Sequence, residues 1–185
     1  MPENNFLSRD DSALIIIDVQ EKLFPYVLDQ LNLQKKIEML AKTAGLLKLP
    51  MILTEHYPKG LGRTIPAIAN LINSAVKIEK TSFGCCGDNG FNDALKKNGK
   101  QKLIISGIEA HICVAQTAIG LKNKGFDVYL AADAISSRDR FDMQIAIERM
   151  RREGIVITTA EAVMYELMQD ASDPLFKEFL KIVKE

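Results

Sequence analysis

The chain has 185 residues, of which 47% are hydrophobic, so it is long and apolar enough to fold around a sizeable core. Lysine plus arginine and aspartate plus glutamate both number 24, a balance that disfavours nucleic acid and anionic membranes as partners. The polar N-terminus has no signal pattern, and no apolar run approaches the ~20 residues of a membrane span, so we expect a cytoplasmic protein that binds a small molecule.

The first predicted element is a strand over residues 13–19, a continuous apolar run interrupted only by Asp18 near its end. Such a run is typical of a strand buried on both faces of a parallel sheet. Ligands of open α/β sheets bind at the carboxyl ends of the strands, so Asp18 is a candidate for chemistry. Capping of the following turn explains an aspartate at this position equally well.

A helix and a second strand follow. Apolar residues spaced three and four apart predict an amphipathic helix over 31–48, and residues 51–55 read as a strand. His56 then lies at that strand's carboxyl end, in a segment 56–62 whose proline and glycines predict a loop. A single histidine is a poor metal site, so His56 is interpreted as a polar pocket wall or a plain surface residue.

The third strand is predicted over 75–80 and ends on Lys80, and a glycine-rich loop over 81–90 follows it. This loop contains the adjacent pair Cys85 and Cys86. Adjacent cysteines bond to each other only with strain, and a redox pair is usually spaced Cys-x-x-Cys. Loop packing or incidental exposure is therefore favoured over a redox site.

The fourth strand is predicted over 102–106 and stops at Gly107, and a helix pattern begins at Cys113. A cysteine in the first turn of a helix lies near unpaired N–H groups and the positive end of the helix dipole, which favour the thiolate. The same N–H groups can bind an oxyanion. On the residue alone, a small buried hydrophobe is the favoured interpretation of Cys113, because free cysteine is among the most buried residue types.

The rest of the chain continues the alternation of strands and helices, with strands predicted over 127–133 and 155–157 and helices over 142–152, 159–168 and 175–184. Six mostly apolar strands that alternate with helices predict a parallel sheet covered on both faces, an α/β fold. The sequence has neither a G-x-G-x-x-G after the first strand nor a Walker lysine loop, so dinucleotide and NTP binding are disfavoured.

Three predicted strand ends carry Asp18, Lys80 and the turn that leads to Cys113. In a parallel sheet these ends lie along one edge. An ammonium group stabilises a thiolate, and an aspartate can take the thiol proton and later activate water. The set is therefore chemically coherent for hydrolysis.

The chain also resembles a known family, the isochorismatase-like cysteine hydrolases, which include nicotinamidases and N-carbamoylsarcosine amidohydrolases. The matching motifs are ALIIIDVQ at 13–20, EKTSF at 79–83 and SGIEAHICV at 106–114. Within the family, the chain is most similar to the isochorismatase-domain-containing subgroup, whose substrates are largely undefined. The resemblance implies one domain over residues 1–185, with a three-layer α/β/α, Rossmann-like fold around a six-stranded parallel sheet.

The resemblance also implies the roles of the site residues. Cys113 would be the nucleophile, Asp18 the general base, and Lys80 the charge that stabilises the thiolate and the transition state. The peptide bond between Ile108 and Glu109 would be cis, and the backbone N–H groups of Glu109 and Cys113 would form an oxyanion hole. The candidates for the substrate pocket are Gln20, Phe24, His56, Tyr57 and Phe83.

Nicotinamidases carry an Asp-x-His and a further histidine that bind a metal beside the pocket. This chain has HYPKGLGRT at 56–64, with His56 as the only histidine of that stretch, so we expect no metal and no other cofactor. The predicted function is hydrolysis of a small-molecule amide or related C–N bond through a thioester on Cys113.

Two alternatives stay open at this stage. The chain could be a catalytically weak binding or interaction protein that keeps the fold, or a thiol redox protein that uses Cys85 and Cys86. A homo-oligomer, either a dimer or a tetramer, is a further expectation from the family. Apolar stripes on the last two helices could serve a subunit contact, although covering the sheet is the simpler use.

Overall fold

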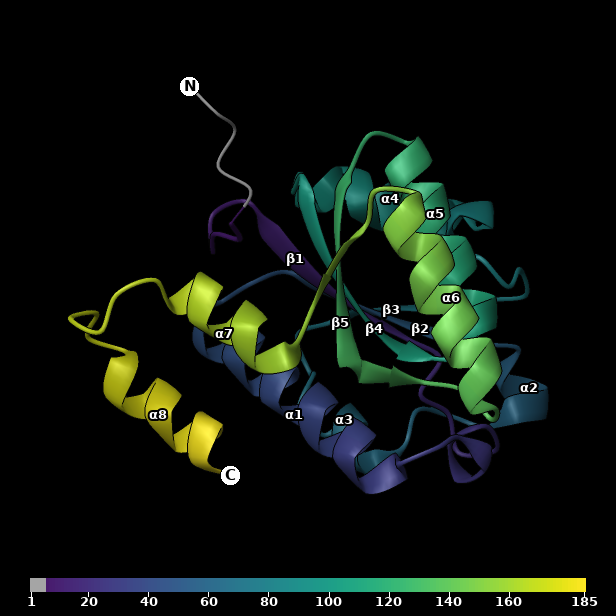
Figure 1. Ribbon diagram of the computed structural model, residues 1–185, viewed down its shortest axis with the longest axis horizontal. Helices are drawn as coiled ribbons and strands as arrows, with labels where there is room; N and C mark the ends of the chain where they lie inside the picture. The colour runs from purple at the N-terminus through teal and green to yellow at the C-terminus, as the bar shows by residue number, and fades with distance from the viewer. Residues whose placement is uncertain (1–5) are drawn as a thin grey trace.

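The computed structural model describes residues 6–185 (Figure 1). The first five residues belong to the polar segment that is predicted to lack a signal, and they lie outside this range. Within residues 6–185, no helix combines the length and the apolar character needed to cross a membrane.

The strands are β1 (Ser12–Ile17), β2 (Met51–His56), β3 (Val76–Lys80), β4 (Lys102–Ile108), β5 (Asp127–Ser136) and β6 (Val156–Thr158). The α-helices are α1 (Gln30–Leu46), α2 (Pro58–Leu61), α3 (Pro66–Ala69), α4 (Asn89–Asn98), α5 (Ala115–Asn123), α6 (Arg140–Arg152), α7 (Ala160–Met168) and α8 (Phe176–Lys184). The shorter turns are the 3-10 helices η1 (Phe24–Tyr26) and η2 (Cys85–Gly87) and the π-helix η3 (Ala110–Val114).

The strands form one parallel sheet in the order β3-β2-β1-β4-β5-β6. The chain builds the sheet outward from β1 through β2 to β3, and then returns to place β4 on the other side of β1. The predicted six-stranded parallel sheet and the three-layer α/β/α fold are thereby confirmed. The direction of building reverses between β1 and β4, and such a reversal is where ligands bind in open α/β sheets.

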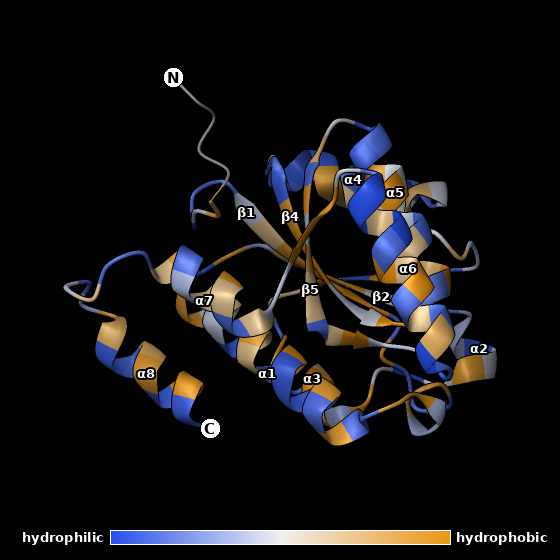
Figure 2. Ribbon diagram, viewed as in Figure 1, coloured by the Kyte–Doolittle hydropathy of each residue, from blue (hydrophilic) through white to orange (hydrophobic). Residues whose placement is uncertain are grey.

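Two apolar cores lie on the two faces of the sheet (Figure 2). Successive residues of a strand point to opposite faces, so Leu14 and Ile16 of β1 enter one core while Ile15 and Ile17 enter the other. Helices α1 and α7 contribute to the first core and α4, α5 and α6 to the second (Figure 1). The double burial of β1 explains why its sequence is a continuous apolar run.

The stripes on the last two helices are buried within the chain. Val163, Leu167 and Met168 of α7 lie in the first core, as does Phe179 of α8. Helix α7 packs on β5 and α1, and α8 packs on α1 and α7. Covering the sheet is therefore confirmed for the stripe of α7, whereas the stripe of α8 is buried against α1 and α7 rather than against the sheet.

The sequence predicts that the fourth strand stops at Gly107, and this is wrong because β4 continues to Ile108. Gly107 has a φ of +119°, and a Cβ atom at this position would lie 2.1 Å from the carbonyl oxygen of Ile17 on β1. A glycine thus permits both the backbone angle and the close approach of the two central strands.

Two other boundaries differ from the prediction, and one predicted strand lies at the sheet edge. The predicted loop at 56–62 contains the short helix α2, which begins at Pro58, a residue whose fixed φ suits a first helical position. The third strand β3 is an edge strand, and most of its residues are at least partly exposed. Ser136, predicted in a loop, is the last residue of β5.

Candidate active site

Asp18 follows β1 directly and has a φ of 52°, in the left-handed region that aspartate tolerates better than most residues. Its backbone N–H donates to the carbonyl oxygen of Thr54 on β2 at 3.1 Å. The residue is fully buried. A carboxylate is therefore held at the carboxyl end of the central strand, as the sequence predicts.

Lys80 ends β3, and its ammonium group reaches the same carboxylate. The distance from Lys80 Nζ to Asp18 Oδ2 is 2.7 Å, and both side chains are inaccessible to solvent. The ammonium also donates to the carbonyl oxygens of Ser82 at 3.1 Å and Phe83 at 3.0 Å. Each of its three protons thus has an acceptor, so Lys80 holds both Asp18 and the loop that follows β3.

Cys113 lies in η3, between β4 and α5, and is 5% exposed. The Asp18 carboxylate is near enough to the Cys113 thiol to affect its pKa, by its charge and as a hydrogen-bond partner. Burial, followed by the negative charge of Asp18, raises the pKa of the Cys113 thiol, and the positive charge of Lys80 offsets only part of this increase. The raised pKa favours the protonated sulfur in the free protein, and the role of Lys80 as the charge that stabilises the thiolate stays a prediction.

The turn before Cys113 is fastened to the segment that follows β5. The peptide bond between Ile108 and Glu109 is cis. The Glu109 carboxylate accepts hydrogen bonds from the backbone N–H and the Nε of Arg138, at 3.1 and 3.0 Å. Nearby, His111 Nδ1 lies 2.9 Å from Ser137 Oγ. These contacts fix the backbone between β4 and Cys113.

Gln20 is fully buried, and its amide group is used within the protein. The amide nitrogen donates to the carbonyl oxygens of His56 and Gly62, at 3.0 and 2.7 Å, and the amide oxygen accepts from the His56 N–H at 2.7 Å. Gln20 therefore ties the segment after β1 to the end of β2 and the loop behind α2. Its placement beside the site follows the prediction, but its polar atoms are occupied by backbone groups.

His56, Tyr57 and Phe83 gather at the carboxyl ends of β2 and β3. The rings of His56 and Phe83 lie 5.0 Å apart, and Tyr57 and Phe83 are each 54% exposed. Burial and the charge of Lys80 lower the pKa of His56, so its imidazole is neutral at pH 7. Phe24, in η1, is half-buried and packs against the first core.

The cysteine pair is split between two environments, and both residues are free thiols. Cys85 is fully buried, and burial raises its pKa from 9.0 to about 11. Cys86 is half-buried, and burial raises its pKa as well. Loop packing is therefore confirmed for Cys85, and two thiols with raised pKa values give no support to a redox pair.

Sequence reasoning missed Thr54 on β2. This strand lies between β1, which precedes Asp18, and β3, which ends at Lys80. The Thr54 hydroxyl donates to Asp18 Oδ1 at 2.6 Å, so each carboxylate oxygen has its own donor. Sequence reasoning also missed Thr117 on α5, whose hydroxyl donates to the Cys113 carbonyl oxygen at 2.6 Å. Both threonines are fully buried. The one sequence signal that could have indicated them is a polar residue within an otherwise apolar element, because buried polar groups need hydrogen-bond partners.

No group of three or more histidine, cysteine, aspartate or glutamate residues within residues 6–185 is placed to hold a metal ion. Glu55, which precedes His56, is engaged instead by Thr64 and Arg63. Its Oε1 accepts from the N–H and hydroxyl of Thr64 at 2.8 Å each, and its Oε2 from Arg63 Nη1 at 2.9 Å. This carboxylate braces the loop beside the site.

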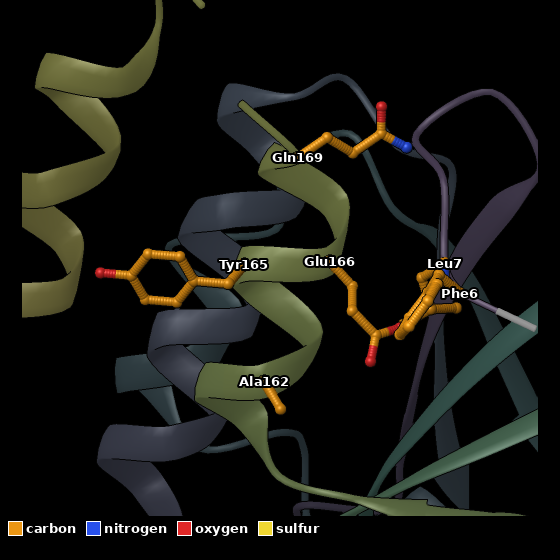
Figure 3. Close-up of a pocket in the computed structure, with 6 residues that line it drawn as sticks. All are labelled: Phe6, Leu7, Ala162, Tyr165, Glu166 and Gln169. Atoms are coloured by element: carbon orange, nitrogen blue, oxygen red, sulfur yellow. The ribbon is translucent and has the colours of Figure 1, made fainter. Parts of the chain in front are cut away.

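A cavity of 620 Å³ lies away from Asp18, Lys80 and Cys113, at the start of β1 (Figure 3). It is lined by Phe6, Leu7, Ala162, Tyr165, Glu166 and Gln169. Glu166 points toward the N-terminal segment, where its carboxylate accepts the N–H of Leu7 at 2.9 Å (Figure 3). Because Leu7 precedes β1, this cavity belongs to the amino-terminal edge of the sheet, opposite the candidate site.

Comparison with known proteins adds independent evidence. The sequence profile described as "Isochorismatase domain" matches residues 12–162. Isochorismatase domain-containing protein 2 of Danio rerio is 37% identical over 177 residues, which cover 96% of this chain and 89% of the relative.

Two solved structures are similar over almost their whole length. MAR1 ribonuclease from Caenorhabditis elegans superimposes with a TM-score of 0.92 and 35% identity, covering 97% of this chain and 93% of that chain. YcaC from Pseudomonas aeruginosa, solved with hexane-2,5-diol and covalent acrylamide, gives a TM-score of 0.93 and 26% identity, covering 99% and 92%.

Proposed function

Because the chain belongs to the isochorismatase family, and within it to the isochorismatase-domain-containing proteins, we propose that it is a hydrolase that cleaves a small-molecule amide or related C–N bond. The observation that carries this proposal is the convergence of Asp18, Lys80 and Cys113, which lie at or after the ends of three different strands. We call these three residues the proposed triad. The Cys113 thiol and the Lys80 ammonium both contact the Asp18 carboxylate, in a site closed to bulk water.

In the first half of the reaction, Asp18 accepts the thiol proton as the Cys113 sulfur attacks the carbonyl carbon. The raised pKa of the thiol supports this order, because the proton stays on sulfur until substrate is present. The tetrahedral intermediate then collapses with cleavage of the C–N bond. Asp18 returns its proton to the departing nitrogen, which leaves as ammonia or an amine.

In the second half, the acyl group is held on Cys113 as a thioester. Asp18, again ionised, takes a proton from water while the water oxygen attacks the thioester carbon. The carboxylic acid product departs, and the proton returns to the sulfur. Lys80 holds Asp18 Oδ2 in place through both halves, and the N–H groups of Glu109 and Cys113 receive the oxyanion.

The acrylamide bound covalently to YcaC supports a reactive nucleophile in a protein of similar fold and sequence. In this chain, the group with the chemistry to add to acrylamide is the Cys113 thiol, with Asp18 as its base. The low exposure of Cys113 and the ring pair formed by His56 and Phe83 favour a small substrate.

The Caenorhabditis elegans relative is named a ribonuclease, so RNA hydrolysis is an alternative function to compare with amide hydrolysis. Cleavage of a phosphodiester needs cations that face the phosphate. The Lys80 ammonium, the cation of the triad, is saturated by Asp18 and two backbone carbonyls, and the chain has no net charge. Amide hydrolysis therefore fits these residues better.

The test is ammonia release from a panel of small primary amides, with Cys113→Ser as the inactive control. Trapping of an acyl group on Cys113, detected by mass spectrometry of the denatured protein, would identify the thioester. RNA is included as a further substrate. No turnover of any amide in the panel would refute the proposal, and the binding-protein alternative would be favoured if RNA is not cleaved either.

The homo-oligomer remains a prediction. Several large apolar side chains stay exposed in the single chain, among them Tyr26 at 70% and Phe141 at 67%. Light scattering coupled to size-exclusion chromatography would distinguish a monomer from a dimer or tetramer.

A further inference from the structure

Behind the triad lies a second set of hydrogen bonds that the proposed chemistry does not use. It begins at Asp18 Oδ1, which accepts the hydroxyl of Thr54 at 2.6 Å. A hydroxyl group has one proton to donate. Because Thr54 gives this proton to Asp18, its oxygen is left as an acceptor for another donor.

That donor is Cys85, whose Sγ lies 3.8 Å from Thr54 Oγ1. The backbone N–H of the same residue donates to Thr117 Oγ1 at 2.9 Å. Thr117 in turn donates to the carbonyl oxygen of Cys113 at 2.6 Å. One residue of the loop after β3 is therefore linked through one threonine to the base, and through another to the backbone of the nucleophile.

Every member of this chain of contacts is buried. Thr54, Cys85 and Thr117 have no exposed surface, so no water competes for their hydrogen bonds. The complete burial of Cys85 also removes it from the reach of oxidants and of substrate. Its thiol is thus neither a second nucleophile nor a redox partner. Its contacts with the two threonines indicate a structural role instead.

We propose that Cys85 is a positioning residue that sets the Asp18 carboxylate and the Cys113 turn relative to each other, through Thr54 and Thr117. This inference rests on the proposed function, because it assumes that Asp18 acts on the Cys113 proton. The S–H of Cys85 aligns the Thr54 hydroxyl with Asp18 Oδ1, while Lys80 holds Oδ2. The carboxylate is thereby fixed at both oxygens.

The physical consequence concerns the proton shared by Asp18 and Cys113. A well-aligned hydroxyl stabilises the charged form of a carboxylate and lowers its affinity for a proton. Without the Cys85 thiol, the Thr54 hydroxyl is free to rotate away from Oδ1. While it stays ionised, Asp18 then accepts a stronger hydrogen bond from the protonated Cys113 thiol, which stabilises the thiol over the thiolate, so less of the reactive thiolate is present at a given pH.

The experiment measures the rate of Cys113 alkylation by iodoacetamide, which reacts with thiolates, from pH 7 to pH 9.5 by peptide mass spectrometry. Four variants are compared with the unaltered protein. Cys85→Ala removes the S–H donor, and Cys85→Ser replaces it with an O–H donor. Cys86→Ala and Cys86→Ser are the matched controls, one position along the chain.

We expect Cys85→Ala to slow alkylation of Cys113 by about three- to tenfold across this pH range, up to the effect of one pKa unit. Cys85→Ser and both Cys86 variants should stay within about twofold of the unaltered protein. A mere loosening of the packing would act in the opposite direction, because it exposes Cys113. A Cys85→Ala rate that is unchanged or faster, or a Cys85→Ser rate as slow as that of Cys85→Ala, would overturn the inference.

If Cys85→Ala does not fold, the pair Thr54→Val and Thr54→Ser addresses the same question at the next residue of the network. The valine should slow alkylation and the serine should restore it. Asp18→Asn separates the two proposals. If the Cys113 rate does not respond to Asp18→Asn, the proposed function fails with the inference; if it responds to Asp18→Asn but not to Cys85→Ala, only the positioning role fails.

Discussion

Lys80 and Asp18 form an ion pair in which neither side chain has any surface exposed to solvent, with 2.7 Å between Nζ and Oδ2. Removing two charges from water costs several kcal/mol for each ion, and their attraction offsets this cost only when the remaining hydrogen bonds are also made. Here they are, because Ser82 and Phe83 accept the other Lys80 protons and Thr54 donates to the second Asp18 oxygen.

Loss of one member of this pair should therefore be severe. Lys80→Met leaves the Asp18 carboxylate buried without its partner, and we expect the free energy of unfolding to fall by about 3–5 kcal/mol. Urea denaturation at pH 7 measures the change. The double variant Lys80→Met with Asp18→Asn removes both charges and should recover a large part of the loss.

The matched control is Lys181→Met, which breaks an ion pair with Glu178 whose side chains are 64% and 53% exposed. A pair in solvent contributes little, so this variant should change the free energy of unfolding by less than about 0.5 kcal/mol. Equal losses for Lys80→Met and Lys181→Met would contradict the description of the triad as a buried ionic site.

The sequence predicts the sheet and the edge of the site because both follow from local patterns. A strand buried on both faces must be apolar throughout, so β1 and β4 can be predicted from their continuous runs of apolar residues. Once the strands are parallel, residues at their carboxyl ends share an edge. The sequence alone therefore predicts that Asp18, Lys80 and Cys113 lie along one edge of the sheet.

The parts of the site that escape prediction depend on register and on loop paths. Thr54 reaches Asp18 because β2 lies between β1 and β3. The sequence of a single strand does not indicate which strands lie beside it. The partners of Gln20 are backbone carbonyls of the loop around α2. The raised pKa of Cys113 results from burial and from the charge of Asp18, neither of which a local sequence pattern contains.

This raised pKa leads to a prediction about reactivity. In the unaltered protein, alkylation of Cys113 by iodoacetamide should be slow at pH 7 and should still be rising at pH 9.5, because the thiolate forms only at high pH. Asp18→Asn removes the negative charge that helps raise the pKa, so alkylation at pH 8 should become about tenfold faster for each unit by which the pKa falls. Amide hydrolysis should be lost in the same variant, since the base is gone.

The contrast between faster alkylation and lost hydrolysis is what distinguishes a base from a simple packing residue. Peptide mass spectrometry follows the first and ammonia release the second. If Asp18→Asn slowed both reactions in parallel, the carboxylate would not be the group that holds the Cys113 proton.

The buried thiol of Cys85 should make the protein sensitive to alkali. Its pKa in the folded protein is about 11, against an ordinary value of 9.0, so above pH 9 the unfolded chain releases a proton that the native state retains. The stability contributed by Cys85 is therefore complete below pH 9 and is lost as the pH rises toward 11. The expected slope is up to about 1.4 kcal/mol of unfolding free energy per pH unit.

Urea denaturation of the unaltered protein and of Cys85→Ser between pH 8 and pH 10.5 isolates this contribution, because serine does not ionise in that range. The two free-energy curves should converge as the pH rises. Parallel curves would mean that Cys85 titrates alike in the folded and unfolded states, which its complete burial does not allow.

Gly107 is the position where the backbone has least freedom. Gly107→Ala would place a Cβ atom 2.1 Å from the Ile17 carbonyl oxygen at a φ of +119°, so the central strands would have to separate next to the site. We expect a loss of about 3 kcal/mol or more in unfolding free energy, from strain and from weakened pairing of β1 with β4.

Gly45→Ala is the matched control, because Gly45 lies in the exposed last turn of α1 with nothing within 4 Å of the new atom. This variant should instead stabilise the protein by about 0.5–1 kcal/mol. The same chemical change at two glycines thus has opposite expected signs in thermal unfolding, and a Gly107→Ala protein as stable as Gly45→Ala would show that β4 does not pass β1 as closely as described.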